Sequence, residues 1–214
     1  MKSYSKEQQD LFAYYLIGEK GTFLDLGCCH PIRDNNSVGL ERIGWTGLCV
    51  DRKDKLHISG KNINLPDTFK RERRTPFLCI NINDDNFLKE VDKFYTSSKH
   101  IDYISLDVNG NSFICLEKLL TTGYSFSCMT FEHDNYRQKG RLKIPSKKLL
   151  EKYNYEILFE DVTTNNATTE NAAWEDWWIN PKSFDNKILS LKDKNLKYSQ
   201  CIDLLKEYNN EKGI

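Results

Sequence analysis

Two short apolar runs, each next to a residue suited to ligand binding, constrain the fold of this chain most strongly. The first run is Thr22–Leu26, which contains Asp25 and leads into Gly27. The second is 47–50, which leads into Asp51, and a helix-like stretch separates the two runs. In open α/β sheets such a glycine lets a ligand approach the backbone, and such a second acid can accept hydrogen bonds from both hydroxyls of a ribose. The pattern therefore predicts a site for a nucleoside-type cofactor.

Strand-like and helix-like segments alternate along the chain, which favours an α/β domain with a mainly parallel sheet. Strands are predicted at 22–26, 47–50, 77–82, 101–108, 126–131, 155–159 and 177–179. Helices are predicted at 5–18, 36–43, 86–95, 113–120 and 146–153, with a largely helical segment at 183–209 and a polar loop at 163–169. We therefore predict a Rossmann-like three-layer sandwich around a mostly parallel seven-stranded sheet.

Length and charge limit the class of protein. The 214 residues fit one domain, with an N-terminal helix at 1–20, a core at 21–182 and a C-terminal helical extension at 183–214. The 31 basic and 31 acidic residues balance, so we expect neither nucleic acid nor a membrane as partner. No apolar run has the length of a membrane span, and the first residues lack the apolar core of a signal peptide. With seven cysteines that read as reduced thiols, this indicates a cytoplasmic protein.

Four acidic residues lie at or near the ends of predicted strands. They are Asp25, Asp51, Asp107 and Glu132. Ligands of open α/β sheets bind at the carboxyl ends of the strands, near the point where the strand order reverses. Four acids at four such ends therefore predict a ligand site more strongly than any one of them alone.

Four ordered motifs carry a family resemblance. The segments FLDLGCCHP, NNSVGLERIGWTGLCVD, IDYISLDVNGN and MTFEHD resemble the FkbM-type methyltransferases that depend on S-adenosylmethionine. The resemblance extends over 5–134, because SKEQQDLFAYYL also looks like the helix that precedes the first strand in that family. It implies a class I methyltransferase fold, S-adenosylmethionine as cofactor, and transfer of a methyl group to a hydroxyl of a sugar or glycan. A small molecule or a glycan is then the expected acceptor.

The same resemblance implies roles for individual residues. Asp51 would bind the ribose hydroxyls, and Asp107 would lie beside the transferable methyl group. Either Asn83 or Asp84, after the third strand, would lie near the adenine amino group. The other residues expected to line the cofactor pocket belong to the first two motifs and are Asp25, Gly27, Cys28, His30 and Asn36.

A cluster after the fifth strand suggests two kinds of chemistry. His133 would act as the general base, because an ordinary histidine pKa lies near neutrality, and Glu132 and Asp107 would complete the catalytic set. Alternatively, Asp107, Glu132 and Asp134 would hold a divalent cation such as Mg²⁺, which would orient and acidify a sugar diol. His30 is the second candidate for the base. The third interpretation is a solvated strand end with a loop histidine.

Several alternatives stay open. Asn109 stands where the family usually has an acid, so a non-catalytic module that binds S-adenosylmethionine or a nucleoside is one alternative. A methyltransferase that acts on nucleic acid or protein is another, and a basic groove on the folded surface would favour the nucleic acid. The basic run at 70–74 would contact phosphates or lie in a solvated loop. The tryptophans of WEDWW would stack on a sugar or pack into the core. The amphipathic C-terminal segment would dock on its own domain or on a second subunit of a homo-oligomer.

Overall fold

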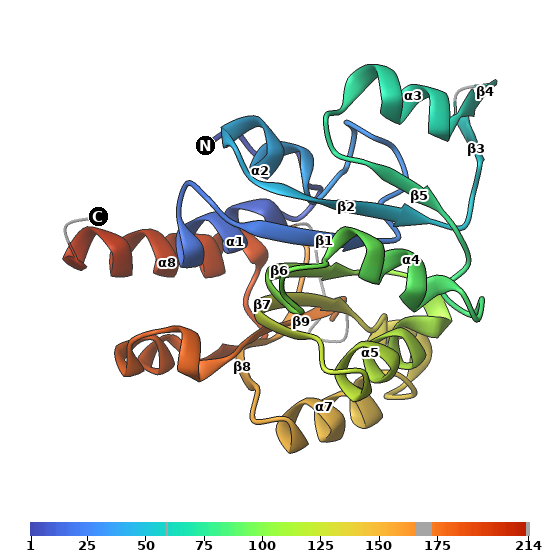
Figure 1. The fold of residues 1–214 in the computed structure, drawn as a ribbon. Coiled ribbons are helices and arrows are strands. Elements are labelled where there is room, and N and C mark those ends of the chain that lie inside the picture. The colour runs from blue at the N-terminus through green and yellow to red at the C-terminus, as the bar shows by residue number, and fades with distance from the viewer. Residues whose placement is uncertain (59, 166–172, 213–214) are drawn as a thin grey trace.

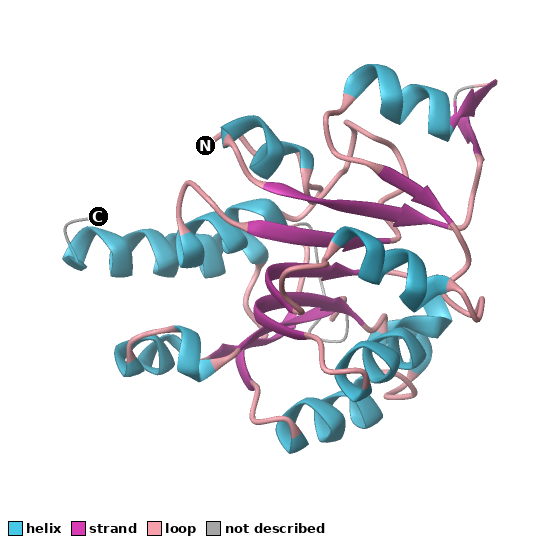
Figure 2. Cartoon of the chain, viewed as in Figure 1, coloured by secondary structure: helices cyan, strands magenta, loops and turns pink. Residues whose placement is uncertain are grey.

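The computed structural model describes residues 1–58, 60–165 and 173–212. Within them, an eight-stranded sheet lies between helices (Figures 1 and 2). Its strands, in spatial order, are β10 (Asp193–Lys194), β8 (Glu156–Val162), β9 (Glu175–Ile179), β7 (Ser125–Glu132), β6 (His100–Leu106), β1 (Thr22–Leu26), β2 (Thr46–Asp51) and β5 (Phe77–Cys79). Neighbouring strands are parallel except at β9, which is antiparallel to both β7 and β8. The α/β class and the mostly parallel sheet are confirmed, and the arrangement is compatible with a Rossmann-like fold.

The helices form the outer layers. They are α1 (Gln9–Ile17), α2 (Val38–Ile43), α3 (Leu65–Glu72), α4 (Phe87–Phe94), α5 (Ser112–Thr121), α6 (Asn135–Gln138), α7 (Lys143–Lys152) and α8 (Tyr198–Lys212). Short 3-10 turns occur at η1 (Asn109–Asn111), η2 (Pro181–Ser183) and η3 (Asn186–Leu191). A separate antiparallel hairpin, β3 (Lys55–Ile58) with β4 (Lys61–Asn64), lies before α3.

Successive side chains along each strand point to opposite faces of the sheet. The two faces therefore carry two separate apolar cores. One core contains Phe87 of α4 and Leu116 of α5, packed on one face of the sheet. The other contains Phe12 of α1, Phe69 of α3 and Leu205 of α8, packed on the opposite face. Figure 1 shows α4, α5 and α7 on one side of the strands and α1 and α8 on the other. The protein is therefore a three-layer sandwich.

The strand order reverses at β1. β1 pairs with β2 on one side and with β6 on the other, with Leu26 opposite Val50 and Leu106. The chain crosses from one half of the sheet to the other between these strands. A crevice at the carboxyl ends of β1 and β6 is where open α/β sheets bind ligands.

The C-terminal part departs from the prediction. The segment predicted as largely helical at 183–209 instead contains η3, then the short strand β10, and only then α8. The side chain of Asp185 accepts a hydrogen bond from Lys187 N, which caps η3 as a separate turn. Asp193 then lies opposite Phe159, so β10 extends the sheet beside β8. The sheet therefore has eight strands, where seven were predicted.

Two smaller corrections concern element boundaries. The first helix begins at Gln9, because Ser5 Oγ accepts the backbone N–H of Asp10 and residues 5–8 form bends. The third predicted strand, at 77–82, ends at Cys79. Residues 166–169 of the predicted polar loop lie outside the described residues.

None of the helices in the described part of the chain combines the length and the apolar character that a membrane crossing requires. Trp177 and Trp178 are fully buried in the two cores. They therefore serve packing and are not available to stack on a substrate.

Candidate functional site

A pocket of about 250 Å³ lies at the carboxyl ends of β1, β2, β6 and β7. Each of these strand ends contributes a residue to its lining, namely Gly27, Asp51, Asp107 and Glu132. A second hollow of about 180 Å³ adjoins it and shares Asp107 and Glu132 with it, together with Trp174. The two cavities therefore form one extended site across the reversal point of the sheet.

Gly27 is required where β1 meets this pocket. Its φ is +87°, and a Cβ built there would lie 1.7 Å from the carbonyl oxygen of Asp107. Its N–H donates to Val50 O at 2.9 Å. The glycine therefore lets the loop after β1 pass directly against the end of β6, and any other residue would push the two apart.

Asp51 is held in a fixed orientation at the β2 end. One carboxylate oxygen, Oδ2, accepts the N–H of Cys29 at 3.0 Å, and the other, Oδ1, accepts the N–H of Lys53 at 2.9 Å. A carboxylate has about four lone-pair sites, so both oxygens can still accept a hydrogen bond from a ligand. The side chain is half-buried and lines the pocket. It is therefore oriented to receive a diol.

The β7 end of the site is rich in carboxyl groups. Burial, with Asp107 and then Asp134 and Glu175 as neighbours, raises the pKa of Glu132 to about 10. Burial also raises the pKa of Glu175 to about 8. Glu175 lines the smaller hollow, and Gln9 Nε2 donates to it at 3.1 Å. Carboxyl groups crowded in a poorly solvated cavity favour a cationic ligand and disfavour a phosphate-bearing one.

The charged side chains at the rim of the pocket are basic. Trp174 stacks on Tyr136 with ring centroids 5.5 Å apart. Lys6 Nζ lies 4.2 Å from the Trp174 ring, and the Arg137 guanidinium lies 4.9 Å from the Tyr136 ring. Arg52 also lines the pocket and, like Lys6 and Arg137, makes no ion pair with a described acid. An acidic interior therefore opens through a rim of aromatic and basic side chains.

Six of the predicted site residues lie where the prediction requires. Gly27, Asp51, Asp107, Glu132 and Asp134 line the pocket, and Asn36 lines the adjoining hollow. The Asn36 amide donates to Ser105 Oγ at 2.9 Å, which ties the start of α2 to β6. The structure thus brings together residues from four of the predicted motifs.

Asp25 and Cys28 are structural. Asp25 is fully buried, accepts a hydrogen bond from Ser37 Oγ at 2.7 Å, and lines neither cavity. Burial raises its pKa to about 6. Cys28 is buried beneath the loop after β1, and its neighbour Cys29 lines the pocket instead. Their predicted role as cofactor ligands is corrected to support of the loop.

His30 also supports this loop and lines neither cavity. Its Nδ1 accepts the N–H groups of Ile32 and Arg33 at 3.1 and 3.0 Å. Burial lowers its pKa, with Arg33 adding to the effect. His30 is therefore an organiser of the loop and not a base in the pocket.

Asn83 and Asp84 lie one turn too far along the chain to line the pocket. Asp84 N donates to Asn81 O, so both residues belong to the turn before α4. The pocket is lined instead by Ile80, Asn81 and Ile82. β5 ends at Cys79, three residues before the predicted end, which shifts the lining positions back along the sequence.

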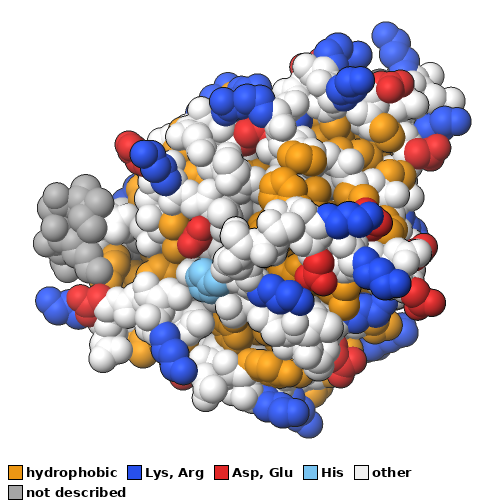
Figure 3. Space-filling view, viewed as in Figure 1, with side chains coloured by type: hydrophobic (Ala, Val, Ile, Leu, Met, Phe, Trp, Pro, Cys, Tyr) orange, Lys and Arg blue, Asp and Glu red, His pale blue; other side chains and the backbone are white. Residues whose placement is uncertain are grey.

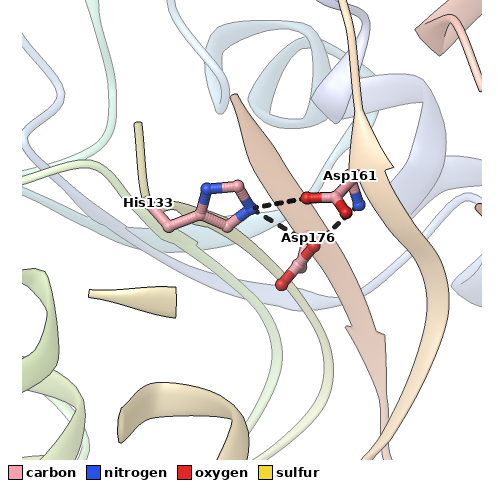
Figure 4. A group of neighbouring side chains, drawn as sticks. All are labelled: His133, Asp161 and Asp176. Atoms are coloured by element: carbon pink, nitrogen blue, oxygen red, sulfur yellow. Dashed lines mark hydrogen bonds and ion pairs between the residues drawn. The ribbon is translucent and has the colours of Figure 1, made fainter. Parts of the chain in front are cut away.

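His133 lines neither cavity, and in Figure 4 its ring points toward Asp161 and Asp176. Side chains alternate along a strand, so the residue after the pocket-lining Glu132 points to the other side. His133 is fully buried, and its Nε2 lies 3.2 Å from Asp176 Oδ1 and 4.0 Å from Asp161 Oδ1. The assignment of His133 as the general base is therefore corrected.

The predicted metal ligands are not gathered as a cation requires. Within the described residues, only His133, Asp161 and Asp176 form a set of three His, Cys, Asp or Glu ligand atoms that all lie within 4.8 Å of one another. Asp107, Glu132 and Asp134 line the pocket without meeting this spacing.

Sequence reasoning missed the buried guanidinium of Arg73. It was placed in a basic run that either contacts phosphates or is solvated, but its side chain is fully buried. Its Nε donates to Glu41 Oε2 at 2.9 Å, and one terminal nitrogen donates to Pro31 O at 2.8 Å. Arg73 therefore fastens the loop after β1 to α2. The only sign of this burial in the sequence is the position of Arg73 just before the apolar strand β5.

Glu175, Tyr136 and Arg137 were also missed. Glu175 is part of WEDWW, which the sequence marks only as aromatic. Tyr136 and Arg137 follow the acidic cluster directly, and their place at the rim depends on the turn after β7.

No protein-family model matches the chain, and no curated protein is significantly similar to it in sequence. Function is therefore inferred from the pocket and from the motifs.

Proposed function

We propose that this protein is an S-adenosylmethionine-dependent methyltransferase of the class I fold, and that it methylates a hydroxyl group of a sugar or glycan. One observation carries the proposal: a single site at the reversal point of the sheet has an oriented acid, Asp51, on its β2 side and a group of carboxyls around Glu132 on its β7 side. The first suits a ribose, and the second suits a positive charge.

The topology supports the same class. Five parallel strands in the order β5, β2, β1, β6 and β7 are followed by a late pair, in which β9 is reversed. The first five have the order 3-2-1-4-5 of nucleotide-binding sheets. The resemblance to class I methyltransferases implies two further strands after the first five, and β8 and β9 agree with that expectation. The sugar as acceptor rests on that resemblance alone.

The residues present fit the cofactor by their chemistry. Asp51 would accept the ribose hydroxyls, and Ile80 and Ile82 offer apolar contacts for the base. Glu175 and Glu7, in the smaller hollow, would face the ammonium group, with Lys6 near for the carboxylate. A pyrophosphate-bearing cofactor would meet these carboxyls with the wrong charge, which argues against a dinucleotide.

Bound S-adenosylmethionine supplies a methyl group on a positively charged sulfur atom. The protein must orient the acceptor hydroxyl and take its proton. Asp107, which lines both cavities, is the residue that would accept the proton of this hydroxyl. Glu132, protonated at neutral pH because its pKa is about 10, donates a hydrogen bond to Asp107 and holds that carboxylate in place.

Transfer of a tritiated methyl group from S-adenosylmethionine to a panel of monosaccharides, sugar phosphates and oligosaccharides tests the proposal. The expected result is labelled product from one acceptor class, reduced at least about a hundredfold in Asp107→Asn, as for loss of a general base. Cofactor binding is expected to persist in this variant. Cofactor binding by the wild type without transfer to any acceptor would instead indicate the non-catalytic module.

A basic surface favours a second candidate, in which the acceptor is part of a nucleic acid. Among the described residues from Arg52 to Arg74, the exposed side chains include seven Lys or Arg and three Asp or Glu. Figure 3 shows Lys and Arg side chains gathered over α3 and the β3–β4 hairpin. Arg52 and Lys53 join this surface to the pocket. Salt-dependent binding of a single-stranded oligonucleotide, weakened by Lys61→Glu and Lys70→Glu, would favour this candidate.

A further inference from the structure

A buried polar cluster lies where β7 and β8 end and β9 begins (Figure 4). His133 Nε2 faces the carboxylates of Asp176 and Asp161, and Asp176 Oδ1 accepts the N–H of Asp161 at 2.8 Å. Asp161 has a φ of +58° at an irregular point in the pairing of β8 with β9. Aspartate adopts this left-handed conformation more readily than most residues, and here the N–H of Asp161 is held by Asp176. The cluster is therefore a built feature of the fold.

The protonation state of His133 follows from its hydrogen bonds. Its Nδ1 accepts the backbone N–H of Asn135 at 3.1 Å, so this nitrogen carries a lone pair. The neutral ring then carries its proton on Nε2, which points at Asp176. The hydrogen bond from Asn135 therefore fixes the tautomer, and Nε2 faces Asp176 without making a hydrogen bond to any described residue.

This tautomer argues against a metal ion in the cluster. A metal bound to Nε2 needs the lone pair of that nitrogen and usually a proton on Nδ1, which donates to a neighbour. In His133 the opposite holds: Nε2 carries the proton and Nδ1 carries the lone pair. The positive charge in the cluster comes from Lys143, whose Nζ lies 2.6 Å from Asp161 Oδ1 and 2.9 Å from Glu160 Oε1. Lys143 therefore supplies a cation next to Asp161, while Nε2 of His133 makes no hydrogen bond within the described residues.

The acceptor bond of Nδ1 determines the shape of the turn after β7. Asn135 begins α6, and Asp134 before it has a φ of +47°. The N–H groups of His133 and Asp134 both donate to Trp174 O at 2.9 Å. This turn carries Asp134, Tyr136 and Arg137 to the pocket. The ring of His133 is the side chain that links the first residue of α6 to the cluster behind it.

We propose that His133 is a positioning residue: its Nδ1 holds the turn with Asp134, Tyr136 and Arg137 against the pocket, while its Nε2 faces Asp176. The consequence for cofactor binding rests on the proposed function. The tautomer of His133 and the order of the turn do not depend on the proposed function.

Two substitutions test the contacts of Nδ1 and Nε2 separately. In His133→Asn the side-chain oxygen occupies the place of Nδ1 and can still accept the Asn135 N–H. In His133→Gln the side-chain nitrogen occupies the place of Nε2 and can still face Asp176. Each variant keeps one contact and loses the other, so they form a matched pair in size and polarity.

Hydrogen exchange of the Asn135 amide is the first measurement. We expect exchange at least about tenfold faster in His133→Gln than in the wild type, and within about threefold of the wild type in His133→Asn. Nitrogen NMR shifts of the wild-type ring are expected to show Nε2 protonated and Nδ1 bare. Equal exchange in the two variants, or a ring protonated on Nδ1, would overturn the proposal.

Binding of S-adenosylmethionine to the same proteins is the second measurement. We expect weaker binding by His133→Gln and recovery in His133→Asn, a difference that a general loss of stability would not produce. If the wild type binds no cofactor, the proposed function fails, while the exchange result still decides the role of His133. Zinc binding by the metal-free wild type that His133→Gln abolishes would contradict the tautomer and with it the proposal.

Discussion

Glu132 of β7 and Glu175 of β9 lie directly opposite each other in an antiparallel pair, and both line cavities of the candidate site. Like charges opposite each other in a sheet are destabilising. Both groups hold protons at neutral pH because burial raises their pKa values, to about 10 and about 8. At neutral pH the pair therefore meets without two opposed negative charges.

The first prediction concerns stability against pH. The pKa of Glu175 is about 8 in the folded protein, against an ordinary value of 4.5, so the folded state binds more protons between these values. Stability should then fall as pH rises from 4.5 towards 8, by up to about 1.4 kcal/mol per pH unit. Glu175→Gln should remove this contribution to the slope, because the amide keeps the shape of the side chain without the charge, and the contribution of Glu132 should remain. Urea unfolding at several pH values measures it.

Glu117→Gln serves as the control, since Glu117 is exposed on α5. It should leave the pH slope of the wild type unchanged. A Glu175→Gln protein with the wild-type slope would show that Glu175 ionises normally in the fold.

The second prediction concerns discrimination between cofactor and product. S-adenosylmethionine carries a positive sulfur that S-adenosylhomocysteine lacks, so only the former gains from ionised carboxyls nearby. Its affinity relative to that of the product should rise at least about threefold between about pH 6 and about pH 8.5, because a proton must leave Glu175, whose pKa is about 8. Glu175→Gln should flatten this rise. Calorimetry across pH measures both affinities, and a constant ratio would contradict the assignment.

The third prediction concerns the contact of Gly27 with Asp107. Gly27→Ala should cost at least about 3 kcal/mol, because a positive φ alone costs an L-residue about 1–2 kcal/mol and the new methyl meets a carbonyl oxygen. Gly123 is the matched control, with a φ of +90° and no atom within 4 Å of a built Cβ. Denaturant unfolding should show a clearly smaller loss for Gly123→Ala. Equal losses would mean that the two strand ends are not in contact.

The fourth prediction concerns the buried pair of Arg73 and Glu41. Arg73→Met should cost about 3–5 kcal/mol, because it leaves a buried carboxylate without its partner. Adding Glu41→Gln should recover part of that loss. Arg71→Met should cost less than about 1 kcal/mol, since the pair of Arg71 with Glu72 is exposed. Thermal and urea unfolding measure all three, and equal costs for Arg73→Met and Arg71→Met would contradict the burial of Arg73.

The sequence predicts those parts of the fold that local patterns determine. β1 was predicted with its observed bounds, because TFLDL is an apolar run that ends at a glycine. Gly27 and Asp51 were predicted correctly as lining residues for the same reason: both follow directly from the ends of buried strands.

The parts that were missed depend on contacts between distant segments. The direction of His133 depends on which face of β7 the pocket occupies, which no local pattern encodes. The role of Glu175 arises from its place opposite Glu132, far away in sequence. β10 forms only because β8 offers a free edge to a segment whose own composition favours a helix.

The central claim is tested most directly by calorimetric titration of S-adenosylhomocysteine into the wild type, Asp51→Asn and Asp54→Asn. Asp54 is an exposed acid three residues beyond Asp51 and lines neither cavity. We predict one site of micromolar affinity in the wild type and in Asp54→Asn, and binding at least about tenfold weaker in Asp51→Asn, as for loss of a charged hydrogen-bond acceptor. A folded wild type that releases no heat, or binding that Asp51→Asn leaves unchanged, would contradict the claim.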